Sequence, residues 1–112
     1  MINTISTSVS GLLAAGKKMS VAANNIANAS TVGSLDPSAP NQPYHALTTV
    51  DQSTAGGGVQ TVVLERNYPL FPMYSPDSPF ADAEGLVGAP NVSLDEELTK
   101  TILAKQSYTA NA

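Results

Sequence analysis

The chain has 112 residues, of which 42% are hydrophobic but only 5% aromatic, so one small domain with a thin core is expected. It contains no cysteine, which excludes disulfides and thiolate metal sites. Only 12% of the residues are charged, which is about half the usual share. The net charge of −4 and five scattered basic residues argue against a nucleic-acid partner. Uncharged polar residues fill the gap, which suits a surface that neighbouring subunits cover.

The N-terminal part of the chain predicts a long helix with one narrow apolar face. Apolar or small residues recur at alternating steps of three and four, at Ile2, Ile5, Val9, Leu12, Gly16, Met19, Ala23 and Ile26. This heptad spacing is typical of a coiled coil rather than of a broad globular core face. We call these positions the heptad seam. The rest of the chain is too short to cover it all, so we expect partner helices to bury part of it.

The middle of the chain, residues 31–92, is predicted to be β-rich. Prolines between residues 37 and 43 exclude a regular helix there. Alternating residues from Tyr44 to position 51, and a second β-rich run at 59–64 after three glycines, predict a small β-hairpin. Five prolines with interspersed apolar residues between 68 and 90 predict an extended Pro-rich arm.

The last part of the chain predicts a second, shorter helix. Ser93 and Glu96 form an S-x-x-E capping box, and Leu98 and Ile102 share a helix face. No stop signal closes this helix before Ala112, so it is expected to be incomplete. The predicted fold is therefore α+β, with a coiled coil of two helices. Its segments are an axial helix at 1–30, the β-rich segment and arm at 31–92, and an axial helix at 93–112.

No arrangement of residues indicates catalysis, a cofactor or a metal site. His45 is the only histidine, and we expect it to be a solvent-facing strand residue without a role. The acidic residues Asp95, Glu96 and Glu97 suit the first turn of a helix through its dipole. The N-terminus lacks a basic leader before an apolar stretch, and no segment reaches the ~20 apolar residues that cross a bilayer. We expect neither a cleaved signal peptide nor membrane insertion.

The strongest motif is the uncharged run at residues 22–31, which is rich in asparagine. Two interpretations stay open. Asn24, Asn25 and Asn28 can bond between subunits, because uncharged amides donate and accept at low desolvation cost. Alternatively, they only fray and cap the end of the helix.

The sequence NNIANAST at 24–31 resembles the signature of flagellar rod and hook proteins. The sequences PDSPFADAEGLV at 76–87, PNV at 90–92 and SYTANA at 107–112 resemble the short proximal-rod members of that family. The resemblance implies a structural subunit of the bacterial flagellar basal-body rod that contributes to motility. It also implies passage through the flagellar type III export apparatus, a place in the periplasmic rod, and other rod proteins and copies of itself as partners. Members of the family continue several helical turns beyond the equivalent of Ala112.

These observations predict an assembly interface on the two helices. It comprises Ile2, Ile5, Val9, Leu12, Met19, Asn24, Asn25, Ile26, Asn28, Leu98, Ile102 and Tyr108. Within the subunit, the heptad seam is expected to pack on Leu98 and Ile102, and neighbouring subunits are expected to bury the rest. The alternatives are an oligomerising binding module that displays the β-rich segment, and another axial protein of the distal rod or hook. An enzyme is the remote third hypothesis, which His45→Ala would test.

Overall fold

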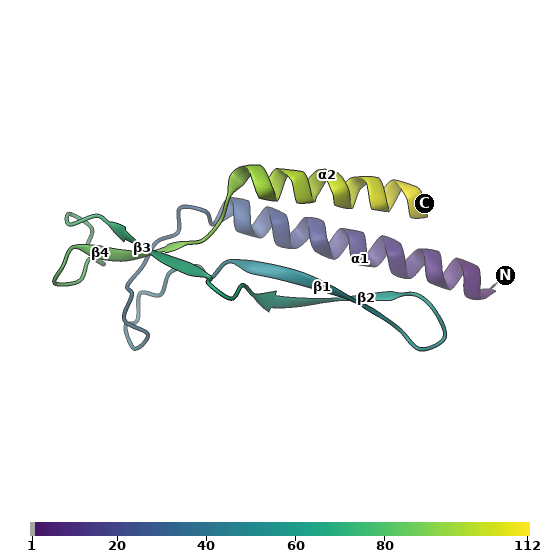
Figure 1. Ribbon diagram of the computed structural model, residues 1–112, viewed down its shortest axis with the longest axis horizontal. Helices are drawn as coiled ribbons and strands as arrows, with labels where there is room; N and C mark the ends of the chain where they lie inside the picture. The colour runs from purple at the N-terminus through teal and green to yellow at the C-terminus, as the bar shows by residue number, and fades with distance from the viewer. Residues whose placement is uncertain (1) are drawn as a thin grey trace.

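The computed structural model describes residues 2–112, and of Ile2 the backbone alone. The chain forms two helices and two antiparallel two-stranded sheets (Figure 1), which confirms the α+β prediction. The elements in chain order are α1 (Ile2–Ala27), β1 (Leu47–Ser53), β2 (Val59–Glu65), β3 (Leu70–Tyr74), β4 (Leu86–Pro90) and α2 (Leu94–Asn111). The predicted role of the Ile2 side chain lies outside the described residues.

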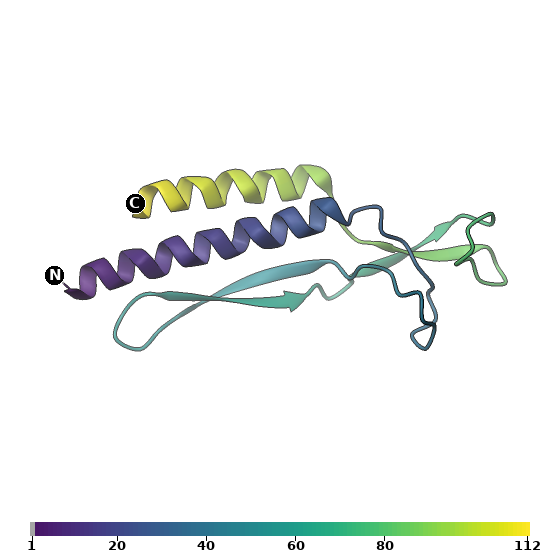
Figure 2. The ribbon, with the colours of Figure 1, turned by 180° about the vertical axis from the view of Figure 1, so that it is seen from behind.

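Helix α1 is the middle layer of an elongated molecule with principal extents of 62 × 25 × 17 Å. Helix α2 lies along one side of α1 and the β1–β2 hairpin along another, as both views show (Figures 1 and 2). The β3–β4 hairpin and the loop after α1 project beyond the helices at the end opposite the two termini. We call residues 28–46 and 67–93, which form this end, the distal lobe.

The two helices pack antiparallel through small side chains. Ala15, Ala22 and Ala104 are buried, and a Cβ on Gly11 would lie 2.5 Å from the Oδ1 atom of Asn111. The helix backbones therefore approach closely, and several of the longer apolar side chains stay largely exposed. Leu98 and Ile102, on which the seam is predicted to pack inside the subunit, are 47% and 58% exposed, so at most about half of each side chain is available for that contact.

The first predicted hairpin is confirmed. Strands β1 and β2 pair antiparallel from Leu47 opposite Glu65 to Ser53 opposite Val59. Gly56 and its two successors turn the chain with positive φ angles, which glycine adopts without strain. The strand begins at Leu47, so His45 precedes it rather than facing solvent from within it. The His45 Nδ1 atom lies 3.3 Å from a carboxylate oxygen of Glu65.

The predicted extended arm is instead a second β-hairpin. Strands β3 and β4 pair antiparallel over residues 70–74 and 86–90. Pro72 argued against a strand here in the sequence. Proline is tolerated in an edge strand, however, where its nitrogen faces away from the paired strand and no N–H is needed. The Asp82 side chain accepts hydrogen bonds from the backbone N–H groups of Glu84 and Leu86, which fixes the connecting turn.

The small-residue contact between the helices should not tolerate a larger side chain. Ala15→Leu places three extra carbon atoms at a position that is 1% exposed. We expect a loss of about 1–3 kcal/mol in the free energy of unfolding, measured by urea denaturation. Leu13→Ala is the control, because Leu13 is 71% exposed and its truncation should change stability by less than about 0.5 kcal/mol. Equal stability of the Ala15→Leu variant and the unmodified chain would contradict the close packing.

Candidate assembly interface

Asn25 fastens α1 to the beginning of the first hairpin. Its Nδ2 atom donates to the carbonyl oxygen of Leu47 at 2.9 Å, and its Oδ1 atom accepts from the Leu47 N–H at 3.1 Å. The carboxamide thus forms with the Leu47 backbone the two hydrogen bonds that a neighbouring strand would form. The hydroxyl of Tyr44 donates to the same Oδ1 atom at 2.6 Å. Asn25 is fully buried, so its polar atoms serve the subunit that contains it.

Arg66 joins the two hairpins to the start of α2. Its Nη2 atom donates to Glu97 at 2.6 Å and to Glu96 at 3.2 Å. Its other nitrogens lie 3.4 Å from the backbone carbonyl oxygens of Leu47 and Asn91. One guanidinium group therefore contacts β1, the segment after β4 and α2, using the fork of donors that only arginine has.

Glu97 is the most unusual residue of this cluster because its side chain is fully buried. Its Oε1 atom faces Arg66 and lies 3.7 Å from the Lys100 Nζ atom. Within the described part of the chain, its Oε2 atom has no hydrogen-bond partner. Burial raises the pKa of the nearby Tyr44 hydroxyl, and the charge of Glu97 raises it further. Glu97 thus does more than complement the helix dipole, the role expected from the sequence.

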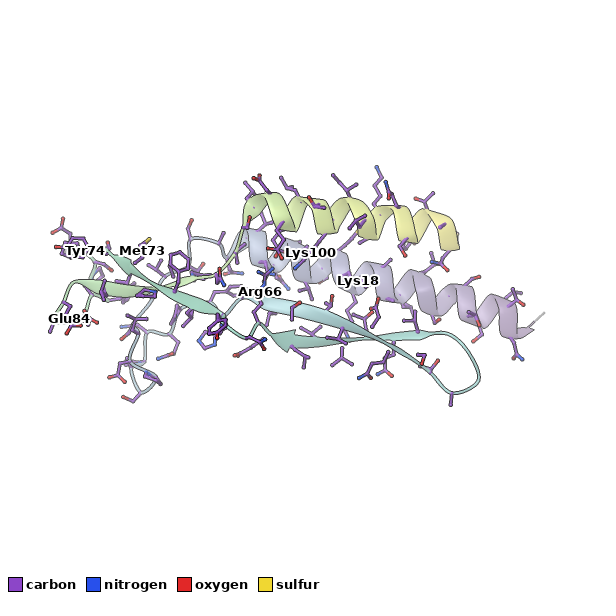
Figure 3. All side chains as sticks on the ribbon, in the orientation of Figure 1. Lys18, Arg66, Met73, Tyr74, Glu84 and Lys100 are labelled. Atoms are coloured by element: carbon purple, nitrogen blue, oxygen red, sulfur yellow. The ribbon has the colours of Figure 1, made fainter. Side chains whose placement is uncertain are left out.

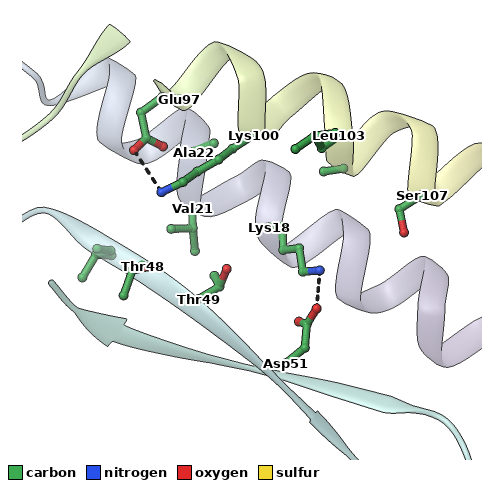
Figure 4. A pocket seen from close by; sticks show the side chains of 12 residues that line it. Lys18, Val21, Ala22, Thr48, Thr49, Asp51, Glu97, Lys100, Leu103 and Ser107 are labelled. Carbon is green, nitrogen blue, oxygen red and sulfur yellow. Dashed lines mark ion pairs between the residues drawn. The ribbon is translucent and has the colours of Figure 1, made fainter. Parts of the chain in front are cut away.

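A groove lies over α1 and is bordered by α2 on one side and β1 on the other (Figure 4). Its volume is about 280 Å³, and Val21 and Ala22 of α1, Thr49 of β1, and Lys100 and Leu103 of α2 contribute to its lining. An ion pair between Lys18 of α1 and Asp51 of β1 forms part of its lining. The groove is open, and its lining combines aliphatic surface with two ion pairs.

Apolar side chains also line the other side of the helix pair. On α1, Ile5 and Val9 of the heptad seam are 65% and 45% exposed, while Leu12, Met19 and Ile26 are half-buried. The residues of α1 that contact the hairpin, Ser10 and Asn25, are on the opposite side by helical periodicity. We call this surface the uncovered face.

Helix α2 continues the uncovered face. Leu94, Leu98 and Ile102 follow each other at i, i+4 spacing and are about half exposed, at 53%, 47% and 58%. The groove side of α2 carries Lys100 and Leu103 instead, so the apolar row points away from the first hairpin. A helix pair with a sheet on one face and bare aliphatic side chains on the other lacks one layer of a normal core.

The remaining predicted residues lie in different surroundings. Asn24 is exposed, and the Asn28 Nδ2 atom donates to the Asn24 carbonyl oxygen at 3.0 Å, which closes the end of α1. The Thr31 hydroxyl donates to Asn28 at 3.1 Å. Tyr108 on α2 is 44% exposed. The capping interpretation therefore describes Asn28, whereas Asn25 forms an internal junction that neither interpretation included.

The predicted capping box is only partly present. Ser93 is the N-cap residue of α2, but its side chain makes no capping hydrogen bond within the described residues. The Glu96 carboxylate instead forms ion pairs with Lys100, at 3.1 Å, and with Arg66. In these contacts both partners are charged, whereas the box would offer the carboxylate only a backbone N–H donor.

Sequence reasoning missed Tyr44, Leu47 and Arg66. The available signal was Arg66, which is the only lysine or arginine between Lys18 and Lys100 and directly follows β2. In residues 2–112, no group of His, Asp and Glu side chains is arranged to hold a metal ion. Neither of the two described helices is long and apolar enough to cross a membrane.

The Asn25 junction should be costly to remove. Asn25→Ala leaves both backbone groups of Leu47 and the Tyr44 hydroxyl without their partner. We expect a loss of about 2–4 kcal/mol in the free energy of unfolding, since each unsatisfied buried group costs roughly 1–3 kcal/mol. Asn24→Ala is the control, because Asn24 is exposed. Similar urea midpoints for the two variants would refute the role of Asn25.

Acid should weaken the fold. The pKa of Asp51 is pushed up by burial, but hydrogen bonds from Lys18 and Thr61 outweigh this and hold it below its ordinary value. A hydrogen bond from Lys100 is the main cause that lowers the pKa of Glu96. A lowered carboxyl pKa stabilises the fold above the unfolded pKa, and this stabilisation disappears as the pH falls through the folded value. The melting temperature should therefore drop between about pH 5 and about pH 3.

The contribution of Asp51 can be isolated with a variant. In Asp51→Asn this acid-induced drop should be smaller than in the unmodified chain. Asp77→Asn is the control, because Asp77 makes no ion pair in the described part of the chain, and its slope should match that of the unmodified protein. A pH profile of Asp51→Asn that matches the unmodified one would show that the Lys18 pair adds nothing.

Known proteins are similar to this chain in sequence. The model of the family "Flagella basal body rod protein" matches residues 5–33, which include the asparagine-rich motif. The chain is 38% identical over 117 residues to the "Flagellar basal-body rod protein FlgC" of Salmonella typhimurium, covering 99% of this chain and 84% of the relative. The proteins of the same name from Yersinia enterocolitica and Aquifex aeolicus are 34% and 32% identical, again over 99% of this chain and 84% of each relative. Such identity over nearly the whole chain shows that it belongs to the flagellar basal-body rod protein family.

Proposed function

We propose that this chain is a structural subunit of the proximal part of the flagellar basal-body rod and polymerises through its helices. The observation that carries the proposal is the uncovered face of the helix pair, which exposes Ile5, Val9, Leu98 and Ile102. Aliphatic rows of this extent mark surfaces that a partner covers. The names of the relatives indicate which assembly supplies that partner.

The partners in this proposal are other rod proteins and further copies of the chain. Their helices complete the missing layer, so that the heptad seam of α1 meets the seams of neighbours. Export through the flagellar type III apparatus without a cleaved signal and a final place in the periplasmic rod are part of the same proposal. The small core favours it, because a marginally stable chain is easily kept unfolded before assembly.

A charge on the uncovered face tests the proposal. Val9→Asp and Ile102→Asp change side chains that are exposed in the isolated chain, so both variants should fold with nearly unchanged urea midpoints. Burial of one such side chain by a neighbour is worth about 1.5–3 kcal/mol, and an unpaired buried carboxylate adds a further penalty. We expect both variants to be lost from purified basal bodies and their strains to be non-motile.

Ser107→Asp is the matched control. Ser107 is exposed and lies on the groove side of α2, so the variant carries the same charge away from the uncovered face and should still support swimming. The proposal fails if Val9→Asp and Ile102→Asp are incorporated into basal bodies as efficiently as the control.

A further inference from the structure

The entire net charge of the chain resides in the distal lobe. This lobe contains Asp36, Asp77, Asp82 and Glu84 but neither lysine nor arginine. In the rest of the chain, the five basic residues equal the acidic ones in number. The molecule is therefore polar along its length, with an acidic lobe at one end and a neutral helical part that contains all its Lys and Arg residues (Figure 1).

An exposed aromatic ring lies beside the turn that carries one of these carboxylates. Tyr74 at the end of β3 is 71% exposed. A Cβ on Gly85 would lie 2.9 Å from the Tyr74 Cε1 atom, so the ring rests against the residue that follows Glu84. Both side chains lie near the outer end of the distal lobe (Figure 3). This tip therefore offers both a flat aromatic surface and a negative charge.

The helical part carries the complementary pair on α1. Leu13 does not belong to the heptad seam, and its side chain is 71% exposed. Lys17 follows four residues later and is also exposed, which places the two side chains one turn apart on the same face. Lys18 and Lys100 are engaged with carboxylates, whereas Lys17, like Lys105 on α2, makes no ion pair in residues 2–112. This site offers an aliphatic surface and a positive charge.

We propose that Tyr74 and Glu84 of one copy dock on Leu13 and Lys17 of a second copy. The Glu84 carboxylate pairs with the Lys17 ammonium group, and the Tyr74 ring covers Leu13 and the aliphatic part of the lysine. The tip of the distal lobe projects away from α1 in the same chain (Figures 1 and 2), so another copy must supply it. Such a contact uses two different surfaces and therefore repeats from copy to copy.

This inference rests on the proposed function and deepens it by naming one pair of surfaces. The contact is small, so it acts where other contacts already hold the copies together and the effective concentration is high. Its contribution is to fix the register between neighbours, because charge pairs at the rim of an interface add specificity more than affinity.

Cross-linking between differently tagged copies tests the contact, because the chain has no cysteine of its own. One copy carries Lys17→Cys and the other Glu84→Cys, and both are incorporated into basal bodies of the same strain. A bismaleimide with a spacer of about 8 Å is used, because residues joined by an ion pair are too far apart for a disulfide. We expect a cross-linked species that contains both tags.

Lys105→Cys replaces Lys17→Cys in the control, because Lys105 is exposed on the other helix. We expect about fivefold more mixed-tag product for the Lys17 pair than for this control. Similar yields for the two pairs, or no mixed product in rods that contain both copies, would overturn the contact and leave the proposed function standing. Absence of the unmodified chain from basal bodies would defeat the proposed function instead.

Charge reversal provides a second readout. Lys17→Glu and Glu84→Lys should each reduce the recovery of the chain in basal bodies by about two- to fivefold. The chain that carries both substitutions should recover most of the loss, because the pair is restored with opposite polarity. Loss in the double variant that equals the product of the single losses would overturn the pairing.

Discussion

The fold depends on a buried polar junction at which Asn25, Arg66 and Glu97 connect the two helices to both hairpins. A two-stranded hairpin alone is barely stable in water, and a short isolated helix is no better. Asn25 substitutes for a missing strand partner of Leu47, while the Arg66 guanidinium group holds carboxylates of α2 and carbonyl oxygens of two other segments. Breaking a buried charge pair costs about 3–5 kcal/mol because the remaining charge stays buried, which is a large share of the stability of a small domain.

The prominence of this junction follows from the thin core around it. The largest fully buried side chains in the described residues are Glu97, Val87 and Asn25, so two of the three are polar. The helices meet through alanines, which permit close approach but bury little apolar area per residue. The subunit consequently keeps its longer aliphatic side chains on the outside. That arrangement destabilises an isolated chain and suits one whose surfaces neighbours complete.

The sequence predicted local structure well because local structure follows from local periodicity. Heptad spacing located α1, and the glycine turn between alternating runs located the first hairpin. The same signals failed where the partner is distant in the chain or the rule has an exception. Pro72 concealed β3 because proline suits an edge strand. Arg66 and Glu97 are 31 residues apart, so no periodicity could pair them. The heptad seam predicted a partner helix, but which side α2 takes is set by the alanine contact and the junction.

The exposed surfaces divide into two kinds whose physical behaviour differs. The uncovered face is aliphatic, so its contribution to assembly scales with buried area and changes little with salt. The distal lobe and Lys17 are charged and exposed, so their attraction is screened within about 8–10 Å at ordinary ionic strength. Aliphatic contact along a helix tolerates sliding by a turn, because similar side chains recur every three or four residues. A charge pair at one position does not tolerate it. The affinity that the uncovered face contributes and the register that the distal lobe and Lys17 fix are therefore separable properties of one short chain.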